Sequence, residues 1–186
     1  MVVFDSTVLL LVLQPEAKPP IDPHTKKTLE HAKERIDFLI RTLSKNKTRI
    51  LIPTPVLGEI LVRAGNATGK YLDEINDNHT FQVADFDQKA AVELAQITAL
   101  HLRNSGQKKM TPHETWAKLK FDWQIVAISK ANGADIIYSD DSDDLKRAAA
   151  AANITVVQTW ELPIAVEDRQ GKLTLEPGVD SGAPEN

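Results

Sequence analysis

The sequence contains no cysteine. It therefore has no disulfide framework, no thiol nucleophile and no Cys-ligated zinc or iron–sulfur site. This absence is compatible with a reducing cytoplasm, which is the compartment we expect. Long hydrophobic runs are also missing, because the apolar run at residues 8–13 is far shorter than the roughly 20 residues that cross a membrane. No basic segment precedes this run, so we expect neither a signal peptide nor membrane association.

Motifs for nucleotide cofactors and for nucleophilic catalysis are absent too. None of the 8 glycines falls into a G-x-G-x-x-G or G-x-x-x-x-G-K-[ST] pattern. The five histidines lack close metal-ligand spacing, and no Ser-His-Asp arrangement can be placed. The carboxylates are the side chains left to carry chemistry.

The negative charge of the chain is concentrated at one end. The 22 Lys and Arg against 26 Asp and Glu give a net charge of −4. Residues 161–186 carry six acids and two bases, which is the whole excess, and residues 1–160 sum to zero. The acidity therefore does not exclude a nucleic-acid partner for the body of the chain. We expect one domain over residues 1–163 and a flexible acidic tail with Gly and Pro over residues 164–186.

Short apolar segments alternate with amphipathic ones along the chain. The predicted strands are residues 2–4, 8–13, 49–52, 81–84, 136–138 and 154–157, with 8–13 as a buried first strand. The predicted helices are residues 25–44, 55–63 with Thr54 as the cap, 68–77, 88–102 with Asp87 as the cap, 112–132 and 143–152. This alternation predicts an α/β fold with a mainly parallel sheet.

Acidic residues occupy positions where such a fold binds ligands. Asp5 follows the strand predicted at residues 2–4, and Asp140 and Asp141 follow the strand predicted at residues 136–138. Ligands of α/β folds bind beyond the carboxyl ends of strands. Glu59 and Asp122 lie within apolar helical segments. Carboxylates that converge on one cavity repel one another unless a cation joins them. Oxygen ligands favour hard ions, so we expect Mg²⁺ or Mn²⁺.

Four short segments carry a family resemblance, namely residues 3–7 (VFDST), 55–60 (PVLGEI), 122–127 (DWQIVA) and 138–141 (YSDD). In this order they resemble the PIN-domain nucleases, over roughly residues 1–160. The resemblance implies a three-layer α/β/α sandwich, a carboxylate cluster that binds Mg²⁺ or Mn²⁺, and hydrolysis of RNA phosphodiester bonds. Many members of the family are toxins of VapBC-type toxin–antitoxin pairs, so an antitoxin protein is an expected partner.

Carried over by position, the resemblance makes Asp5, Glu59 and Asp122 the first three acids of the cluster. The fourth is either Asp140 or Asp141. The family's Thr/Ser-x-Asp pattern falls on residues 139–141 and indicates Asp141, whereas Asp140 lies closer to the strand.

Other polar residues would support the cluster. Ser6 and Ser139 are candidate supporting hydroxyls, and Thr7 stands where the family often has Asn or Ser. Basic residues before Asp122 are candidates for contact with RNA phosphates. They are Lys108, Lys109, Lys118 and Lys120.

The expected activity is that of a hydrolase, a metal-dependent endoribonuclease whose bound ion produces a nucleophilic water. One alternative is a non-catalytic PIN-like module that binds RNA or protein. Another is an aspartate-nucleophile phosphatase, although that class usually needs a second Asp where this chain has Thr7. We also expect a homodimer, because Trp116 and Trp123 are seven residues apart and line one helix face.

Overall fold

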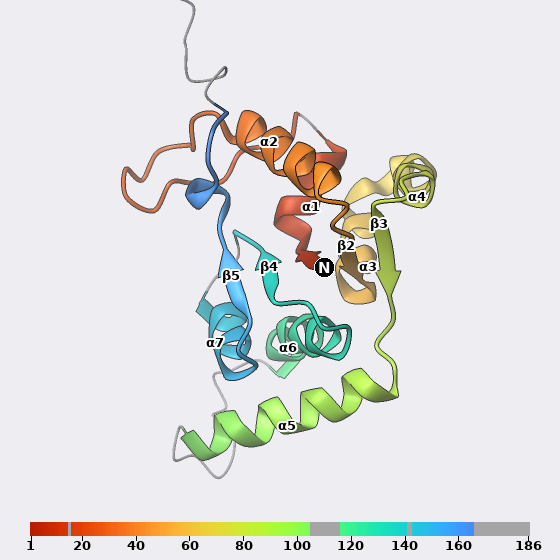
Figure 1. The fold of residues 1–186 in the computed structure, drawn as a ribbon, viewed down its shortest axis with the longest axis vertical. Coiled ribbons are helices and arrows are strands. Elements are labelled where there is room, and N and C mark those ends of the chain that lie inside the picture. Colours follow the sequence, from red (N-terminus) through yellow and green to blue (C-terminus); the bar gives the residue numbers. More distant parts are fainter. Residues whose placement is uncertain (15, 105–115, 141–142, 166–186) are drawn as a thin grey trace, which may run out of the picture.

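The computed structural model describes residues 1–14, 16–104, 116–140 and 143–165. Side chains of residues 104, 116–120 and 143–144 are not part of this description. The elements, shown in Figure 1, are β1 (Val2–Phe4), α1 (Ser6–Leu13), α2 (Ala32–Lys45), β2 (Ile50–Pro53), α3 (Thr54–Ala64), η1 (Gly65–Ala67), α4 (Thr68–Asp77), β3 (Phe81–Ala84), α5 (Gln88–Asn104), α6 (Trp116–Ala131), β4 (Ile136–Tyr138), α7 (Asp143–Ala151), β5 (Thr155–Val157) and η2 (Thr159–Glu161).

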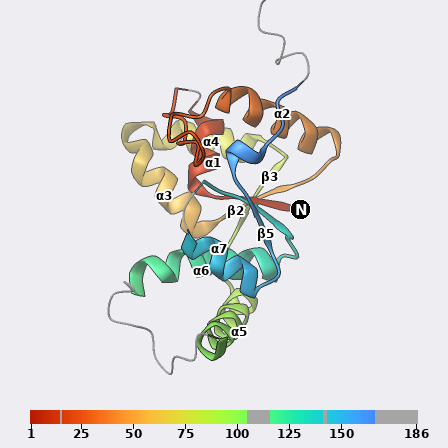
Figure 2. The same cartoon turned by 90° about the vertical axis from the view of Figure 1, so that its left-hand side faces the viewer.

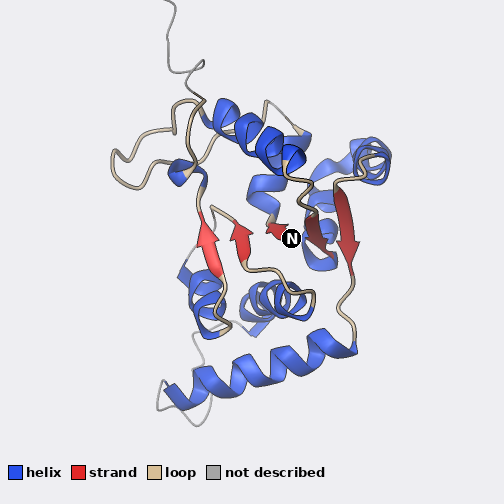
Figure 3. Cartoon of the chain, viewed as in Figure 1, coloured by secondary structure: helices blue, strands red, loops and turns tan. Residues whose placement is uncertain are grey.

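The five strands form one parallel sheet in the order β3-β2-β1-β4-β5. The strands lie in the centre of the molecule, with helices around them (Figure 3). From β1 the chain builds β2 and β3 on one side and later β4 and β5 on the other. The strand order therefore reverses at β1, and ligands bind at such a reversal, beyond the carboxyl ends of the strands. Asp5 follows β1 at that point.

Helices cover both faces of the sheet. In Figures 1 and 2, α1 and α2 lie on one side of the strands and α6 and α7 on the other, with α5 packed outside α6. Strands β1 and β2 are buried over their whole length. Burial on both faces explains why their sequences are continuously apolar rather than alternating. The α/β fold with a parallel sheet is confirmed.

The prediction of a strand at residues 8–13 is wrong, because these residues belong to helix α1. Strand β1 ends at Phe4, and Asp5 keeps extended backbone angles before the helix begins at Ser6. The apolar face of α1 then packs into the core through Val8, Leu9 and Leu13. A short apolar run has no periodicity that distinguishes a strand from a buried helix, and the leucines favour helix.

Helix α2 begins at Ala32, later than the predicted start at residue 25. Lys26 and His31 adopt left-handed backbone angles, and Ile21 pairs with Thr28 in an isolated bridge. These features hold the preceding segment in an irregular loop. Other described boundaries agree with the predictions to within about two residues, as element ends usually do.

The sequence also predicted the caps of α3 and α5. Asp87 caps α5 as predicted, because its carboxylate accepts the Ala90 N–H at 2.9 Å. Thr54 is the first residue of α3, whereas it was predicted to be its cap. The predicted loop and capping box at residues 105–115 and the tail from residue 166 lie outside the described residues. In the part of the chain that is described, no helix is long and apolar enough to span a bilayer.

Candidate active site

Asp5 is a buried carboxylate fixed at the point where the strand order reverses. Its side chain is held by Ser139, whose Oγ donates to Asp5 Oδ2 at 2.7 Å. Thr7 Oγ1 lies 3.4 Å from the same oxygen. The Asp5 amide donates to the Tyr138 carbonyl at 3.0 Å, which ties the end of β1 to the end of β4. The carboxylate is thus oriented by two hydroxyls, one directly after β4 and one in the first turn of α1.

Thr7 provides a second link between the segments that follow β1 and β4. Its Oγ1 accepts the Asp140 N–H at 3.0 Å while it lies beside Asp5. The sequence marked this position only as a departure from the family pattern, yet a hydroxyl there serves both the carboxylate and the backbone. Ser6, which was predicted together with Ser139 as a supporting hydroxyl, is buried at the first position of α1.

Both carboxylate oxygens of Asp140 accept hydrogen bonds from one residue, Thr159. The Thr159 N–H donates to Oδ1 at 2.7 Å, and the Thr159 Oγ1–H donates to Oδ2 at 2.5 Å. Burial raises the pKa of the Asp140 carboxyl above its ordinary value, although the two hydrogen bonds from Thr159 oppose that rise. The side chain therefore fixes the start of η2 beside β4. This engagement favours Asp141, which lies outside the described residues, as the fourth acid of the cluster.

Glu59 and Asp122 meet at one pocket between α3 and α6. The pocket has a volume of ≈ 660 Å³. The remaining residues that line it are Thr54, Pro55, Gly58, Val62, Arg63 and Phe121. Two acids that are 63 positions apart in the sequence thus share one cavity, as the metal-site hypothesis requires.

Glu59 lies on the exposed side of α3, whereas the sequence placed it in apolar surroundings. Its neighbours Val56 and Ile60 are fully buried, so α3 turns these two side chains toward the core and leaves Glu59 at the surface. Arg63, one turn later, forms an ion pair with Glu59 at 2.5 Å. Asp122 is half-buried on α6. The pocket therefore contains a carboxylate already paired with a guanidinium and a second carboxylate nearby.

The pairing of β1 with β2 relates Asp5 to the start of α3. Val2 pairs with Ile50 and Val3 with Leu51, and continuing this parallel register by two residues places Asp5 opposite Pro53. Thr54, the next residue, lines the pocket, whereas Asp5 does not.

The donor chemistry fits a hard divalent cation. Asp5, Glu59 and Asp122 offer only oxygen atoms, which is the ligand type of Mg²⁺ and Mn²⁺. Within the described ranges, no three Asp, Glu or His side chains are grouped closely enough to hold a metal ion. The described residues include Asp5, Glu59 and Asp122, whereas Asp141 lies outside them.

The residues predicted to bind RNA phosphates are only partly located. Lys108 and Lys109 lie outside the described residues, and Lys118 and Lys120 lie in the first turns of α6 with side chains that are not described. Sequence reasoning missed Arg63 and Phe121, which line the pocket. A signal for both existed, since Arg63 is four residues after Glu59 on one helix and Phe121 directly precedes Asp122.

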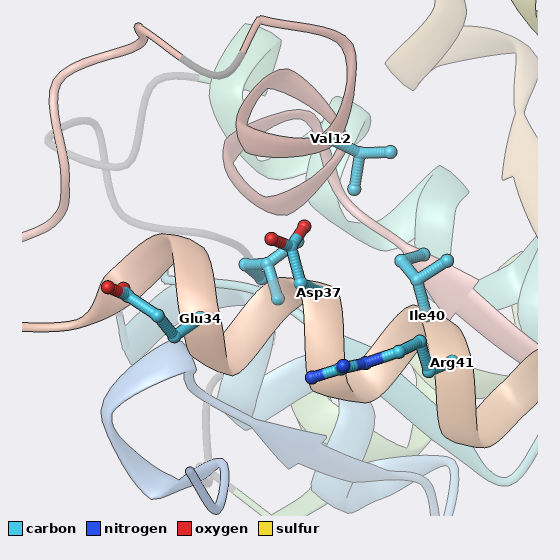
Figure 4. Close-up of a pocket in the computed structure, with 6 residues that line it drawn as sticks. Val12, Glu34, Asp37, Ile40 and Arg41 are labelled. Carbon is cyan, nitrogen blue, oxygen red and sulfur yellow. The ribbon is translucent and has the colours of Figure 1, made fainter. Parts of the chain in front are cut away.

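A second pocket of ≈ 420 Å³ lies between α1 and α2 and contains none of the predicted acids. It is lined by Val12, Glu34, Ile36, Asp37, Ile40 and Arg41. In Figure 4 the Asp37 carboxylate points from α2 toward α1. Its acids supply matched controls for substitutions in the candidate site.

The reason given for a homodimer does not hold for Trp123. This side chain is buried within the chain, and its ring packs edge-on against His101 of α5 with centroids 4.9 Å apart. Helix α5 already covers that face of α6. The Trp116 side chain is not described.

Comparisons with known proteins identify the fold. No protein-family model matches the sequence, and no match to a curated protein is found. Two solved structures are similar: VapBC2 from Rickettsia felis bound to a DNA fragment from its promoter, and DNA-bound VapBC from Salmonella typhimurium. The first has a TM-score of 0.55 at 15% identity, over 85% of this chain and 98% of that chain. The second has a TM-score of 0.52 at 18% identity, over 85% and 97%. The PIN-like fold that the sequence resemblance predicted is confirmed.

Proposed function

We propose that this protein is a metal-dependent endoribonuclease. The observation that carries the proposal is the pocket that Glu59 and Asp122 share in a PIN-like fold. Asp5, a buried carboxylate held by Ser139 where the strand order reverses, is the third acid that we assign to the site. Carboxylates in such an arrangement suit a cation that acts on phosphodiesters.

The residues of the chain would share the work as follows. Asp5, Glu59 and Asp122, together with Asp141, would hold Mg²⁺ or Mn²⁺. When bound, the ion lowers the pKa of a water and polarises the scissile phosphate. Ser139 and Thr7 keep the Asp5 carboxylate in one orientation, which preserves the ligand geometry in the absence of the ion. Arg63 balances the charge of Glu59.

An antitoxin is the protein partner that we propose. Its support is the likeness to VapBC complexes over nearly the whole length of their matched chains. The toxin role, the cytoplasmic location and the homodimer are parts of the same proposal. We expect a small reading frame next to the gene. Its product should copurify with this chain and suppress its cleavage of RNA.

Cleavage of single-stranded RNA by the full chain tests the catalytic proposal. We expect cleavage with Mg²⁺ or Mn²⁺, none with EDTA, and none with Asp5→Asn or Asp122→Asn. The matched control is Asp37→Asn, which removes an acid from the second pocket and is expected to cleave normally. Cleavage that persists in EDTA or in both site variants would refute the proposal.

The same assay separates the alternatives. A non-catalytic module would bind RNA or protein without turnover and without dependence on metal. A phosphatase would release phosphate from a monoester such as p-nitrophenyl phosphate and leave RNA intact. Either pattern would replace the nuclease assignment.

A further inference from the structure

Large apolar side chains are exposed around the candidate pocket. Phe121 is 56% exposed and Val62 is 83% exposed, and both line the same cavity as Glu59 and Asp122. Water-exposed side chains of this size that gather at one cavity indicate a surface used for binding. The two come from different helices, α6 and α3, so the fold and not local sequence brings them together.

Gly58 lines the pocket without a side chain of its own. A Cβ built on this residue meets no atom within 4 Å, although Gly58 lies inside a helix where alanine would be more stable. Its backbone angles do not require glycine, since its φ is not positive. The missing side chain therefore enlarges the cavity between Pro55, Val62 and Phe121.

The residues that line the pocket are of two chemical kinds. Pro55, Val62 and the Phe121 ring are apolar, whereas Glu59 and Asp122 carry carboxylates. A nucleotide likewise combines a flat base with a phosphate, which a cation held by carboxylates would bind. The volume of ≈ 660 Å³ lies in the range of sites that enclose small organic groups.

We propose that this pocket is a subsite for one unpaired base of an RNA strand, which stacks on Phe121 next to the scissile phosphate. The proposal rests on the proposed function, because that function places the phosphate at the carboxylates. A base within a duplex is already stacked and paired, so the subsite selects single-stranded segments. Aromatic stacking accepts any base, so Phe121 would favour unpaired RNA over duplex RNA with little sequence preference.

Binding measured in EDTA tests the subsite without turnover. The probe is a labelled single-stranded RNA of roughly ten nucleotides, within the site sizes of single-strand-binding proteins, followed by fluorescence anisotropy. We expect Phe121→Ala and Phe121→Leu both to weaken binding about tenfold, because each removes the ring that stacks on a base. Gly58→Leu, which fills the cavity, is expected to weaken binding as much. Val92→Ala changes an exposed apolar residue of α5 that does not line this pocket, and should bind as the wild type does.

Two further kinds of RNA decide what occupies the pocket. The same RNA annealed to its complement should bind more weakly and should not respond to Phe121→Ala. The second kind is a set of single-stranded RNAs, each of which lacks the base at one different position. For one of them we expect Phe121→Ala to leave binding unchanged, because the base that stacks on Phe121 is already missing. Circular dichroism and thermal melting of each variant confirm that it is folded.

The outcomes are distinguishable from those of the cleavage assay. Unchanged single-strand binding in Phe121→Ala and Gly58→Leu, or equal losses for single strand and duplex, would overturn the base subsite and leave the nuclease proposal intact. Normal binding by Phe121→Leu with loss in Phe121→Ala would also overturn it, since an apolar protein contact, such as one from a partner, needs bulk and not a ring. Specific single-strand binding without any metal-dependent cleavage would support the subsite and refute the nuclease.

Discussion

At the scale of single residues, hydroxyl groups determine how the acids are held. Ser139 and Thr7 converge on one oxygen of Asp5, and Thr159 engages both oxygens of Asp140. Each of these carboxylates is buried or largely so, and a buried carboxylate without donors would be costly. The hydroxyls therefore stabilise the fold and set the direction in which Asp5 is presented.

Ser139→Ala should weaken Mn²⁺ binding and cleavage about tenfold, because groups that orient a metal ligand typically contribute that much. Isothermal titration with Mn²⁺ and single-turnover cleavage measure the two effects. The matched control is Ser129→Ala, which removes another fully buried serine whose Oγ donates to the Ile125 carbonyl at 2.7 Å. Equal losses in both variants would show a general packing effect instead.

Asp140→Ala should lower the free energy of unfolding by about 1–3 kcal/mol, because the Thr159 N–H loses its partner in a buried position. Asp140→Asn should cost less, since its amide oxygen still accepts that N–H. Urea unfolding compares the two. Cleavage by Asp140→Asn should remain, while Asp141→Asn should abolish it. The reverse result in folded protein would make Asp140 the fourth acid.

At the scale of elements, the start of each helix places the chemistry. Helix α1 begins directly after Asp5, and α3 begins directly after β2 and carries Glu59 on its exposed side. Helix α6 brings Asp122 to the same cavity as Glu59. Helix periodicity separates these acids from the buried residues beside them in the sequence.

Arg63→Ala should tighten Mn²⁺ binding several-fold, because the guanidinium of α3 competes with a cation for the Glu59 carboxylate. The stability of the helix should change by less than about 0.5 kcal/mol, as is usual for an exposed pair four residues apart. Isothermal titration and thermal melting measure the two quantities. Weaker Mn²⁺ binding in this variant would mean that Arg63 assists the site and does not compete with the ion.

Gly58→Ala should raise the free energy of unfolding by about 0.5–1 kcal/mol, because alanine replaces glycine within α3 and its Cβ enters open space. Urea unfolding measures this gain. Gly133→Ala is the contrasting variant, since Gly133 has a φ of +70° after α6 and a side chain there is strained. A loss of stability in Gly58→Ala would show that the cavity is smaller than the structure indicates.

At the scale of the whole molecule, the parallel sheet determines where the candidate site lies. The carboxyl ends of all five parallel strands lie at the same edge, and the reversal at β1 opens it to ligands. Both faces of β1 and β2 are sealed by the core. We therefore expect the fold to form without a metal ion, and a bound ion would add to its stability by mass action.

Mn²⁺ at a hundred times its dissociation constant should raise the free energy of unfolding of the full chain by about 2.7 kcal/mol. EDTA should reverse the gain without unfolding the protein. Thermal melting with and without Mn²⁺ measures it. Asp5→Asn should lose the gain, whereas Asp37→Asn, from the second pocket, should keep it. A gain of equal size in both variants would place the ion elsewhere.

The amino-acid sequence by itself determined most of the order of strands and helices and the positions of the acids that we propose for the site. Alternating apolar segments and the ordered acids at Asp5, Glu59 and Asp122 are local patterns, so they can be read without coordinates. The run at residues 8–13 was misassigned because its length and composition suit either a strand or a buried helix.

Only the tertiary structure decided which groups meet. The contact of Ser139 with Asp5 spans 134 positions, and the pocket that joins Glu59 to Asp122 depends on how α3 packs against α6. The engagement of Asp140 by Thr159 likewise follows from the pairing of β4 with β5. Such contacts arise from packing between distant segments, and no spacing within one segment encodes them.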